Sequence, residues 1–262
     1  MTKPILNIVK TGGKIVEDEA QLDVLLSAFA EWRGAKVLVH GGGSQAASLS
    51  ARLGIAPRMH EGRRITDADT LNVVTMVYGG LLNKQVVAAL QSKGCDALGM
   101  TGADANTIPA RRRPAGAVDW GFVGDPDPAL VNVQRLQDLL SIGLSPVFAA
   151  LTHDGKGQVL NTNADTIASS LAIALSAHYS VDLWYCFEKP GVLANPADDA
   201  SVITEITPGS YAQLKADKVV TDGMLPKLDN AFAALHAGVL RVRLGDTRFL
   251  NDPARGTTLS LS

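Results

Sequence analysis

The stretch ILNIVKTGGKIV, residues 5–16, places an apolar run directly before two glycines that lie between Lys10 and Lys14. A short apolar run of this kind is typical of a buried strand, and the residues after the glycines can begin a helix. Paired glycines let backbone N–H groups approach a bound group closely, and the start of a helix carries partial positive charge. The stretch therefore predicts a strand-turn-helix unit that binds an anion, with phosphate as the expected group.

A second glycine cluster follows the next apolar run, in KVLVHGGGSQAAS at residues 36–48. If the two strands are neighbours, their glycine turns place two sets of backbone donors side by side. Gly41, Gly43 and Ala46 also satisfy the dinucleotide pattern GxGxxA, with Glu61 near the distance of a ribose-binding acid. That interpretation is disfavoured because residues 55–66 are polar and resemble a loop, whereas the acid of a dinucleotide site ends a second apolar strand.

Strand-like and helix-like segments alternate along the chain, which predicts an α/β fold with a mainly parallel sheet covered on both faces. Residues 103–125 interrupt this pattern with many Pro, Gly and Arg residues and are expected to form hairpins and loops, with residues 111–113 as a solvated turn. We expect one continuous sheet. Its strands are expected at residues 5–10, 36–40, 95–100, 145–150, 181–187 and 239–244, and its helices at 19–32, 67–92, 133–142, 164–177 and 227–237.

The amino-acid composition argues against a membrane protein and against a nucleic-acid-binding protein. With 46% hydrophobic and 19% charged residues, the chain resembles an ordinary globular protein, and no apolar run reaches the roughly 18 residues of a membrane span. The net charge of −2 gives no electrostatic footprint for nucleic acid.

The N-terminus lacks an apolar secretory segment, so a cytoplasmic location is expected. Cys95 and Cys186 lack metal-site spacing and are expected to be buried thiols, and no residue is assigned as a metal ligand.

Three further motifs combine charge with turn residues. In GRRIT, Arg63 and Arg64 could clamp a carboxylate, although a single loop arginine is usually solvated. In NTNAD, Asn163 is expected to cap a helix. In TDGMLPK, residues 221–227, the turn precedes a helix that has Pro226 at its start.

Taken together, these segments resemble the acetylglutamate kinase branch of the amino acid kinase family. The resemblance covers nearly the whole chain, and GRRIT with NTNAD carries the branch assignment. The matching segments, in order, are KTGGK (10–14), VHGGG (39–43), GRRIT (62–66), LLNK (81–84), GFVGD (121–125), NTNAD (161–165), FEKPGVL (187–193), TDGMLPK (221–227) and GTT (256–258).

The resemblance implies a three-layer αβα sandwich in a single domain. Residues 1–180 would form an N-terminal lobe for the acyl amino acid, and residues 181–262 a C-terminal lobe for the nucleotide. It also implies ATP- and Mg²⁺-dependent phosphorylation of the side-chain carboxylate of N-acetyl-L-glutamate, a step of arginine biosynthesis.

The resemblance also implies roles for individual residues. Lys10 and Lys227 would neutralise the transferring phosphoryl group, and Asp165 would orient both lysines. Residues expected to bind substrate are Gly42, Gly43, Arg64 and Asn161, with Gly42 also directing its N–H at the phosphates, and residues expected to bind the phosphates or the rest of ATP are Gly12, Gly13, Glu188, Lys189, Gly191, Thr221 and Gly223.

Several alternatives stay open at this stage. Relatives with an alternative acyl group would use N-succinyl-L-glutamate, whose additional carboxylate could be bound by Arg63. A non-catalytic binding or regulatory protein on the same fold would keep the glycine turns, although the retention of Lys10, Asp165 and Lys227 disfavours this class. Finally, the short N-terminus lacks the leading helix of arginine-inhibited hexameric relatives, so an arginine-insensitive homodimer is expected.

Overall fold

The computed structural model describes residues 2–60, 63–220 and 224–261. Its central sheet has eight strands in the order β12-β14-β13-β11-β1-β2-β8-β5. Every neighbouring pair is parallel except β13 and β14. The strand bounds are β1 Ile5–Thr11, β2 Ala35–His40, β5 Ala97–Met100, β8 Ser145–Ala149, β11 Ser180–Cys186, β12 Glu205–Ile206, β13 Arg241–Gly245 and β14 Thr257–Leu259.

The predicted α/β fold is confirmed, because all the strands expected from the sequence lie in this one sheet. The sheet is continuous across residue 180, since β1 pairs with β11 on one side and with β2 on the other. The proposed division into an acyl-amino-acid lobe and a nucleotide lobe therefore stays a prediction about function.

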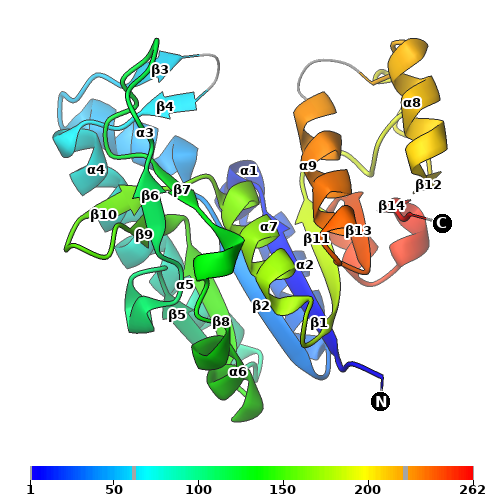
Figure 1. Cartoon of the computed structure of the whole chain (residues 1–262), viewed down its shortest axis with the longest axis horizontal. Helices are drawn as coiled ribbons and strands as arrows, with labels where there is room; N and C mark the ends of the chain where they lie inside the picture. Colours follow the sequence, from blue (N-terminus) through cyan, green and yellow to red (C-terminus); the bar gives the residue numbers. More distant parts are fainter. Residues whose placement is uncertain (1, 61–62, 221–223, 262) are drawn as a thin grey trace.

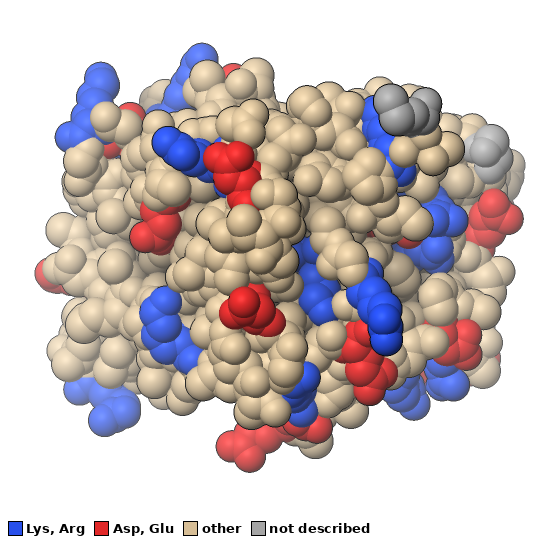
Figure 2. All heavy atoms as spheres, turned by 90° about the horizontal axis from the view of Figure 1, so that it is seen from below, with Lys and Arg blue, Asp and Glu red and all other residues tan. Residues whose placement is uncertain are grey.

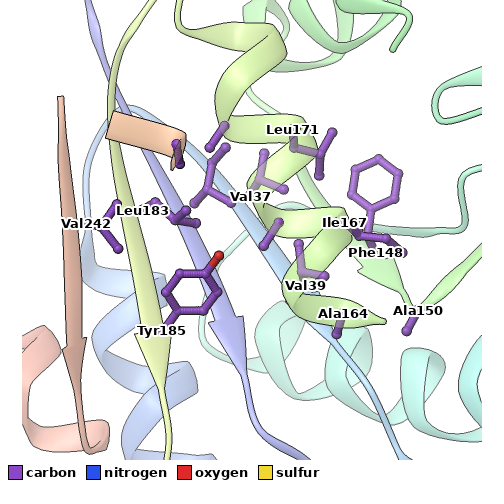
Figure 3. Close-up of a cluster of buried hydrophobic side chains, with 14 of the residues drawn as sticks. Val37, Val39, Phe148, Ala150, Ala164, Ile167, Leu171, Leu183, Tyr185 and Val242 are labelled. Atoms are coloured by element: carbon purple, nitrogen blue, oxygen red, sulfur yellow. The ribbon is translucent and has the colours of Figure 1, made fainter. Parts of the chain in front are cut away.

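Side-chain alternation along the strands produces two hydrophobic layers. In β1, Leu6 and Ile8 belong to one buried cluster and Val9 to the other, because successive side chains of a strand point to opposite faces. Figure 3 shows the first cluster, where side chains of β2, β11 and β13 meet Ile167 and Leu171 of a covering helix.

Helices cover both faces of the sheet, which gives three layers (Figure 1). Residues of α6, α7 and α9 pack in the first cluster, and residues of α2 and α5 pack in the second. The helix bounds are α1 Gly13–Glu17, α2 Glu19–Glu31, α3 Gly43–Arg52, α4 Ala68–Val74, α5 Asn83–Ser92, α6 Val133–Ser141, α7 Ala164–Leu175, α8 Pro208–Ala216 and α9 Leu225–His236. Short 3₁₀ turns are η2 Asp104–Asn106, η3 Pro128–Leu130, η4 Thr247–Leu250 and η5 Pro253–Arg255.

Among the described residues, three antiparallel pairs of short strands accompany the central sheet, and we refer to each pair as a hairpin. They pair β3 Arg58–His60 with β4 Arg63–Ile65, β6 Ala110–Arg112 with β7 Gly124–Pro126, and β9 Leu151–His153 with β10 Val159–Asn161. The β6–β7 hairpin confirms the hairpins and loops expected at residues 103–125. Residues 55–66 are not simply a loop, as the sequence suggested, because they contribute the β3–β4 hairpin, whose strands are too short to show periodicity.

The helix expected at residues 67–92 is continuous, but its middle part, η1 Thr75–Leu82, is a π-helix. The whole segment Ala68–Ser92 is long and apolar enough to cross a membrane by length and composition, although 44% of its most apolar window is buried inside the structure. Buried helices of globular proteins meet the same criterion. On the face of the molecule in Figure 2, basic and acidic side chains of the described residues are interspersed.

Candidate active site

A cavity of about 570 Å³ opens where the carboxyl ends of β1, β2 and β11 meet the starts of α1, α3 and α7. This is the edge at which parallel sheets generally bind ligands. Its lining contains most of the predicted site residues: Lys10, Gly13, Gly42, Gly43, Arg64, Asn161, Asp165, Glu188 and Lys227.

Two lysines converge on one carboxylate in this cavity. The Lys10 Nζ lies 2.9 Å from Asp165 Oδ1, and the Lys227 Nζ lies 3.6 Å from Asp165 Oδ2. Lys10 comes from β1, Asp165 from the first turn of α7, and Lys227 from the first turn of α9. Asn163 caps α7 as predicted, because its side chain accepts a hydrogen bond from the Asp165 N–H at 2.7 Å. The sheet and two helix starts thus bring together residues that are 217 positions apart at the extremes, from residue 10 to residue 227.

We refer to Lys10, Asp165 and Lys227 as the triad. Burial and the neighbouring charges of the triad shift the pKa values of Asp165 and Lys227. Burial raises the pKa of the Asp165 carboxyl, but the Lys10 and Lys227 ammonium groups outweigh burial and hold that pKa below its ordinary value. Burial lowers the pKa of Lys227, with Asp165 opposing the shift and Lys10 adding to it. Asp165 is therefore a carboxylate at neutral pH that keeps two cations close together.

Aromatic rings hold the Lys227 ammonium from the side of β11. Its Nζ lies 5.3 Å from the centroid of the Tyr185 ring and 5.5 Å from that of the Phe187 ring. Cation–π contacts of this length attract an ammonium to the ring face. Tyr185 lines the cavity and is almost fully buried, and its side chain appears among the core residues in Figure 3.

The two glycine turns face each other, as expected from neighbouring strands. A Cβ placed on Gly13 would lie 3.8 Å from the Gly43 backbone nitrogen. Gly13 and Gly43 are the first residues of α1 and α3, so their N–H groups have no partner within the helix.

The expectation that the Gly12 N–H points at the phosphates is not met in this structure. This N–H donates to the Cys186 carbonyl at 3.0 Å, which extends the pairing of β1 with β11 past the last ladder residue. The N–H is therefore not directed at a phosphate in this structure, and Gly12 is not part of the cavity lining.

Packing against the π-helical segment explains why residue 42 is a glycine. A Cβ on Gly42 would lie 2.3 Å from Leu82 Cδ1 and 2.9 Å from Tyr78 Cδ1. The wide turn of η1 thus presses two side chains against the glycine loop. A side chain at position 42 would therefore require Leu82 and Tyr78 to move.

Arg64 and Asn161 enter the cavity from the β3–β4 and β9–β10 hairpins. Arg64 donates from Nη2 to the Gly43 carbonyl at 2.9 Å, while its buried Nη1 has no hydrogen-bond partner among the described residues. Asn161 donates from Nδ2 to Thr66 Oγ1 at 3.0 Å. A buried guanidinium nitrogen without an acceptor is suited to a ligand carboxylate.

The interpretation of residues 111–113 as a solvated turn is wrong for Arg113. Its guanidinium lines the cavity, donates from Nε to Asp125 Oδ2 at 2.9 Å, and lies 5.4 Å from the centroid of the Trp120 ring. Arg63 also lines the cavity. The antiparallel pairing of β6 with β7 positions Arg113, and a single sequence without tertiary contacts gives no signal for it.

Only some of the residues expected to bind the nucleotide line the cavity. Glu188 lines the cavity and lies 3.5 Å from Lys14, from its Oε1 to the lysine Nζ. Lys189 instead pairs with Asp199 at 2.8 Å outside the cavity lining. Gly191 packs against the core, since a Cβ there would lie 2.7 Å from Thr257 Oγ1. Five residues of the motifs and candidates taken from the sequence lie outside the described ranges: Glu61, Gly62, Thr221, Asp222 and Gly223.

Several residues line the cavity without having been predicted as site residues. Tyr78 comes from the π-helical segment, and Met59 and Trp120 come from the region of the short hairpins. Apolar and aromatic residues of this kind read as core in a sequence, so only their spatial neighbours reveal them. Thr11, Lys14 and Ser44 also line the cavity and lie next to predicted positions.

The described residues contain no group of three or more His, Cys, Asp or Glu side chains that could hold a metal ion. Within the described ranges, the carboxylates of the cavity lining are Asp165, which pairs with both lysines, and Glu188. This donor set suits a Mg²⁺ ion that arrives with phosphate ligands of its own.

Comparison with known proteins agrees with this geometry. The family model described as "Amino acid kinase family" matches residues 6–246. An acetylglutamate kinase of Bacteroides thetaiotaomicron is 57% identical over 90% of this chain and 91% of its own length, and one of Bacteroides fragilis is 55% identical over 92% and 91%.

A solved structure supports the fold alone. N-acetylglutamate synthase from Neisseria gonorrhoeae, complexed with coenzyme A and N-acetyl-glutamate, superposes with a TM-score of 0.82 at 20% identity, over 100% of this chain and 60% of that one. The sheet order, the paired glycine turns and the family match lead to one conclusion. The chain belongs to the amino acid kinase family.

Proposed function

We propose that the protein transfers the γ-phosphoryl group of ATP to the side-chain carboxylate of N-acetyl-L-glutamate, giving N-acetyl-L-glutamyl 5-phosphate. The observation that carries this proposal is the convergence of Lys10 and Lys227 on Asp165 inside the cavity. The high identity to named acetylglutamate kinases selects the substrate. By that identity, the reaction would serve arginine biosynthesis.

The chemistry requires charge neutralisation more than proton transfer. A glutamate side chain has an ordinary pKa of about 4.3, so the acceptor is already an anionic nucleophile at neutral pH. The barrier arises from bringing this anion in line with the negatively charged phosphates, and catalysis of phosphoryl transfer is mostly positioning and electrostatics. Lys10 and Lys227 would bind the phosphoryl oxygens, and Asp165 would keep both ammonium groups in place.

The remaining cavity residues would position the acceptor. Arg64, with its unpartnered Nη1, would bind the α-carboxylate together with Asn161. The N–H groups of Gly42 and Gly43 would point at the phosphoryl group and the attacking carboxylate. Gly13 and Glu188 would contact the nucleotide, and Mg²⁺ bound to the ATP phosphates would supply further positive charge.

A hydroxamate assay tests the reaction directly. Acyl phosphate formed from ATP and N-acetyl-L-glutamate reacts with hydroxylamine, and the coloured hydroxamate should depend on both substrates and on Mg²⁺. Nucleotide binding without hydroxamate would instead support the non-catalytic binding protein.

A second acyl group is supported by one observation. Arg63 lines the cavity in addition to Arg64, which provides one more cationic group than a single α-carboxylate needs, whereas the third arginine of the lining, Arg113, pairs with Asp125. N-succinyl-L-glutamate carries an additional carboxylate that Arg63 could bind. The comparison of kcat/KM for the two acyl glutamates decides between them, and a marked preference for the succinyl compound would overturn the first choice.

We further propose a homodimer in the cytoplasm that is insensitive to arginine. The apolar residues Met76 and Leu81 of η1 and Leu98 of the edge strand β5 are 52%, 52% and 37% exposed, and a second copy could cover them. The free buried thiols Cys95 and Cys186 fit a reducing compartment. Light scattering, cell fractionation and an arginine titration of the kinase activity test the three statements, and a monomer, a hexamer or arginine inhibition would contradict them.

A further inference from the structure

The buried imidazole of His40 lies directly behind the second glycine turn and outside the cavity lining. It is the last residue of β2 and has no solvent exposure. Its Nδ1 lies 2.8 Å from the Gly41 carbonyl oxygen, and its Nε2 lies 3.1 Å from Asn83 Nδ2.

The hydrogen bonds of Asn83 determine which ring nitrogen carries the proton. Asn83 Nδ2 also donates to the Val147 carbonyl at 2.9 Å, and Asn83 Oδ1 accepts from Lys84 Nζ at 3.2 Å. Both contacts fix the orientation of the amide, so His40 Nε2 faces a donor and must accept. The proton then lies on Nδ1, which donates to the Gly41 carbonyl.

This donation also orients the next peptide group. The Gly41 carbonyl and the Gly42 N–H belong to one planar trans peptide unit, in which they point in opposite directions. A carbonyl held toward the buried ring therefore turns the Gly42 N–H away from it. Gly42 lines the cavity, and His40 does not.

We propose that His40, held in its Nδ1-protonated form by Asn83, is a positioning residue that directs the Gly42 N–H at the transferring phosphoryl group. This inference rests on the proposed kinase function. The ring stays neutral during turnover, because burial lowers the pKa of His40 to about 4. It acts as a fixed donor to the backbone and exchanges no proton with substrate.

Two substitutions test the two hydrogen bonds of the His40 ring one at a time. The side-chain amide of His40→Asn can place its nitrogen near the position of Nδ1, which keeps a donor for the Gly41 carbonyl and loses the contact with Asn83. The longer amide of His40→Gln reaches toward the position of Nε2, which keeps the Asn83 contact and loses the bond to Gly41. Exposed His178 supplies the control His178→Gln.

We expect kcat of His40→Gln to fall on the order of 10-fold to 100-fold, with little change in KM for ATP, because a small misplacement of a catalytic donor costs about this much. His40→Asn should retain kcat within about threefold, by the same reasoning on geometry. Equal losses in both variants, or a full kcat in His40→Gln, would overturn the proposal. Thermal unfolding of the variants excludes loss of folding as the cause.

Nuclear magnetic resonance gives a readout that does not depend on activity. The ¹⁵N shifts of His40 should show a protonated Nδ1 and an unprotonated Nε2, and the amide signals of Gly42 and Gly43 should move in His40→Gln more than in His40→Asn. An Nε2-protonated ring would refute the inference. A wild-type chain with the expected ring signals but no acetylglutamate phosphorylation would refute the proposed function alone.

Discussion

The two sides of the candidate active site are held in place by different forces. Around the second glycine turn, the side chains of His40, Asn83 and Leu82 are at most 2% exposed, and they hold the backbone of the turn in place by packing and hydrogen bonds. Among the residues expected on the nucleotide side, charged groups pair at the surface, as in Glu188 with Lys14 and Lys189 with Asp199. Close packing specifies positions to a fraction of an ångström, whereas exposed ion pairs contribute about 0–1 kcal/mol each. The acceptor side is therefore expected to be preorganised and the nucleotide side to adjust to its ligand.

Removal of either lysine of the triad should have the largest effect. Lys10→Ala and Lys227→Ala are each expected to lower kcat on the order of 100-fold to 1000-fold, because each deletes a preorganised cation at the phosphoryl group. Steady-state kinetics with saturating ATP measures the loss. An unchanged kcat in both variants would remove them from the mechanism.

Gly42→Ala tests whether close packing holds the second glycine turn in place. The new methyl group would lie 2.3 Å from Leu82 Cδ1, so the free energy of unfolding should fall by about 1–3 kcal/mol, as for other overpacked sites. The matched variant is Gly80→Ala in η1, the segment that packs against Gly42, because a Cβ on Gly80 would meet nothing within 4 Å. Urea unfolding should show this control to be as stable as the parent chain or slightly more stable. Equal stability of the two variants would mean that the glycine loop is not held by packing.

Asp165→Asn should change the pH dependence of the reaction. Asp165 opposes the burial that lowers the pKa of Lys227, so its removal lowers that pKa further. The alkaline limb of the kcat profile, where Lys227 loses its proton, should therefore move to lower pH. A profile that keeps its alkaline limb would show that Lys227 does not act as a cation.

The same variant should also lose an acid-dependent contribution to stability. The pKa of Asp165 is lowered in the folded chain, so its ion pairs stabilise the protein above the ordinary carboxyl pKa, and this contribution disappears as the pH falls through the lowered value. Unfolding of Asp165→Asn should depend less on pH across that acid range. Parallel curves for the two chains would contradict the assigned pairing.

The smallest effect is expected on the nucleotide side. Lys189→Ala removes an ion pair whose side chains are 50% and 65% exposed, so stability and KM for ATP should change little. Isothermal titration with ATP measures this directly. A loss of ATP affinity above about tenfold, or 1.4 kcal/mol, would show that Lys189 leaves Asp199 to bind the nucleotide.

Sequence reasoning was most successful where chain geometry is local. The apolar runs located the central strands, and strand-turn-helix units placed Lys10, Gly13 and Gly43 at the carboxyl edge of the sheet. It failed where a residue's partner comes from elsewhere in the chain. Arg113 reads as part of a solvated arginine run, and only the pairing with β7 turns it into the cavity.

The sequence by itself determined the α/β fold, the positions of six strands of the central sheet, and the residue types available for phosphoryl transfer, whereas β12, β14 and α8 were not expected. These features follow from periodicity and turn chemistry, which act over a few residues. Only the tertiary structure decided that Lys10 and Lys227 share Asp165, that Gly12 pairs with Cys186, and that a buried histidine supports the glycine loop. Such contacts depend on the packing of distant segments, which no local pattern in the chain records.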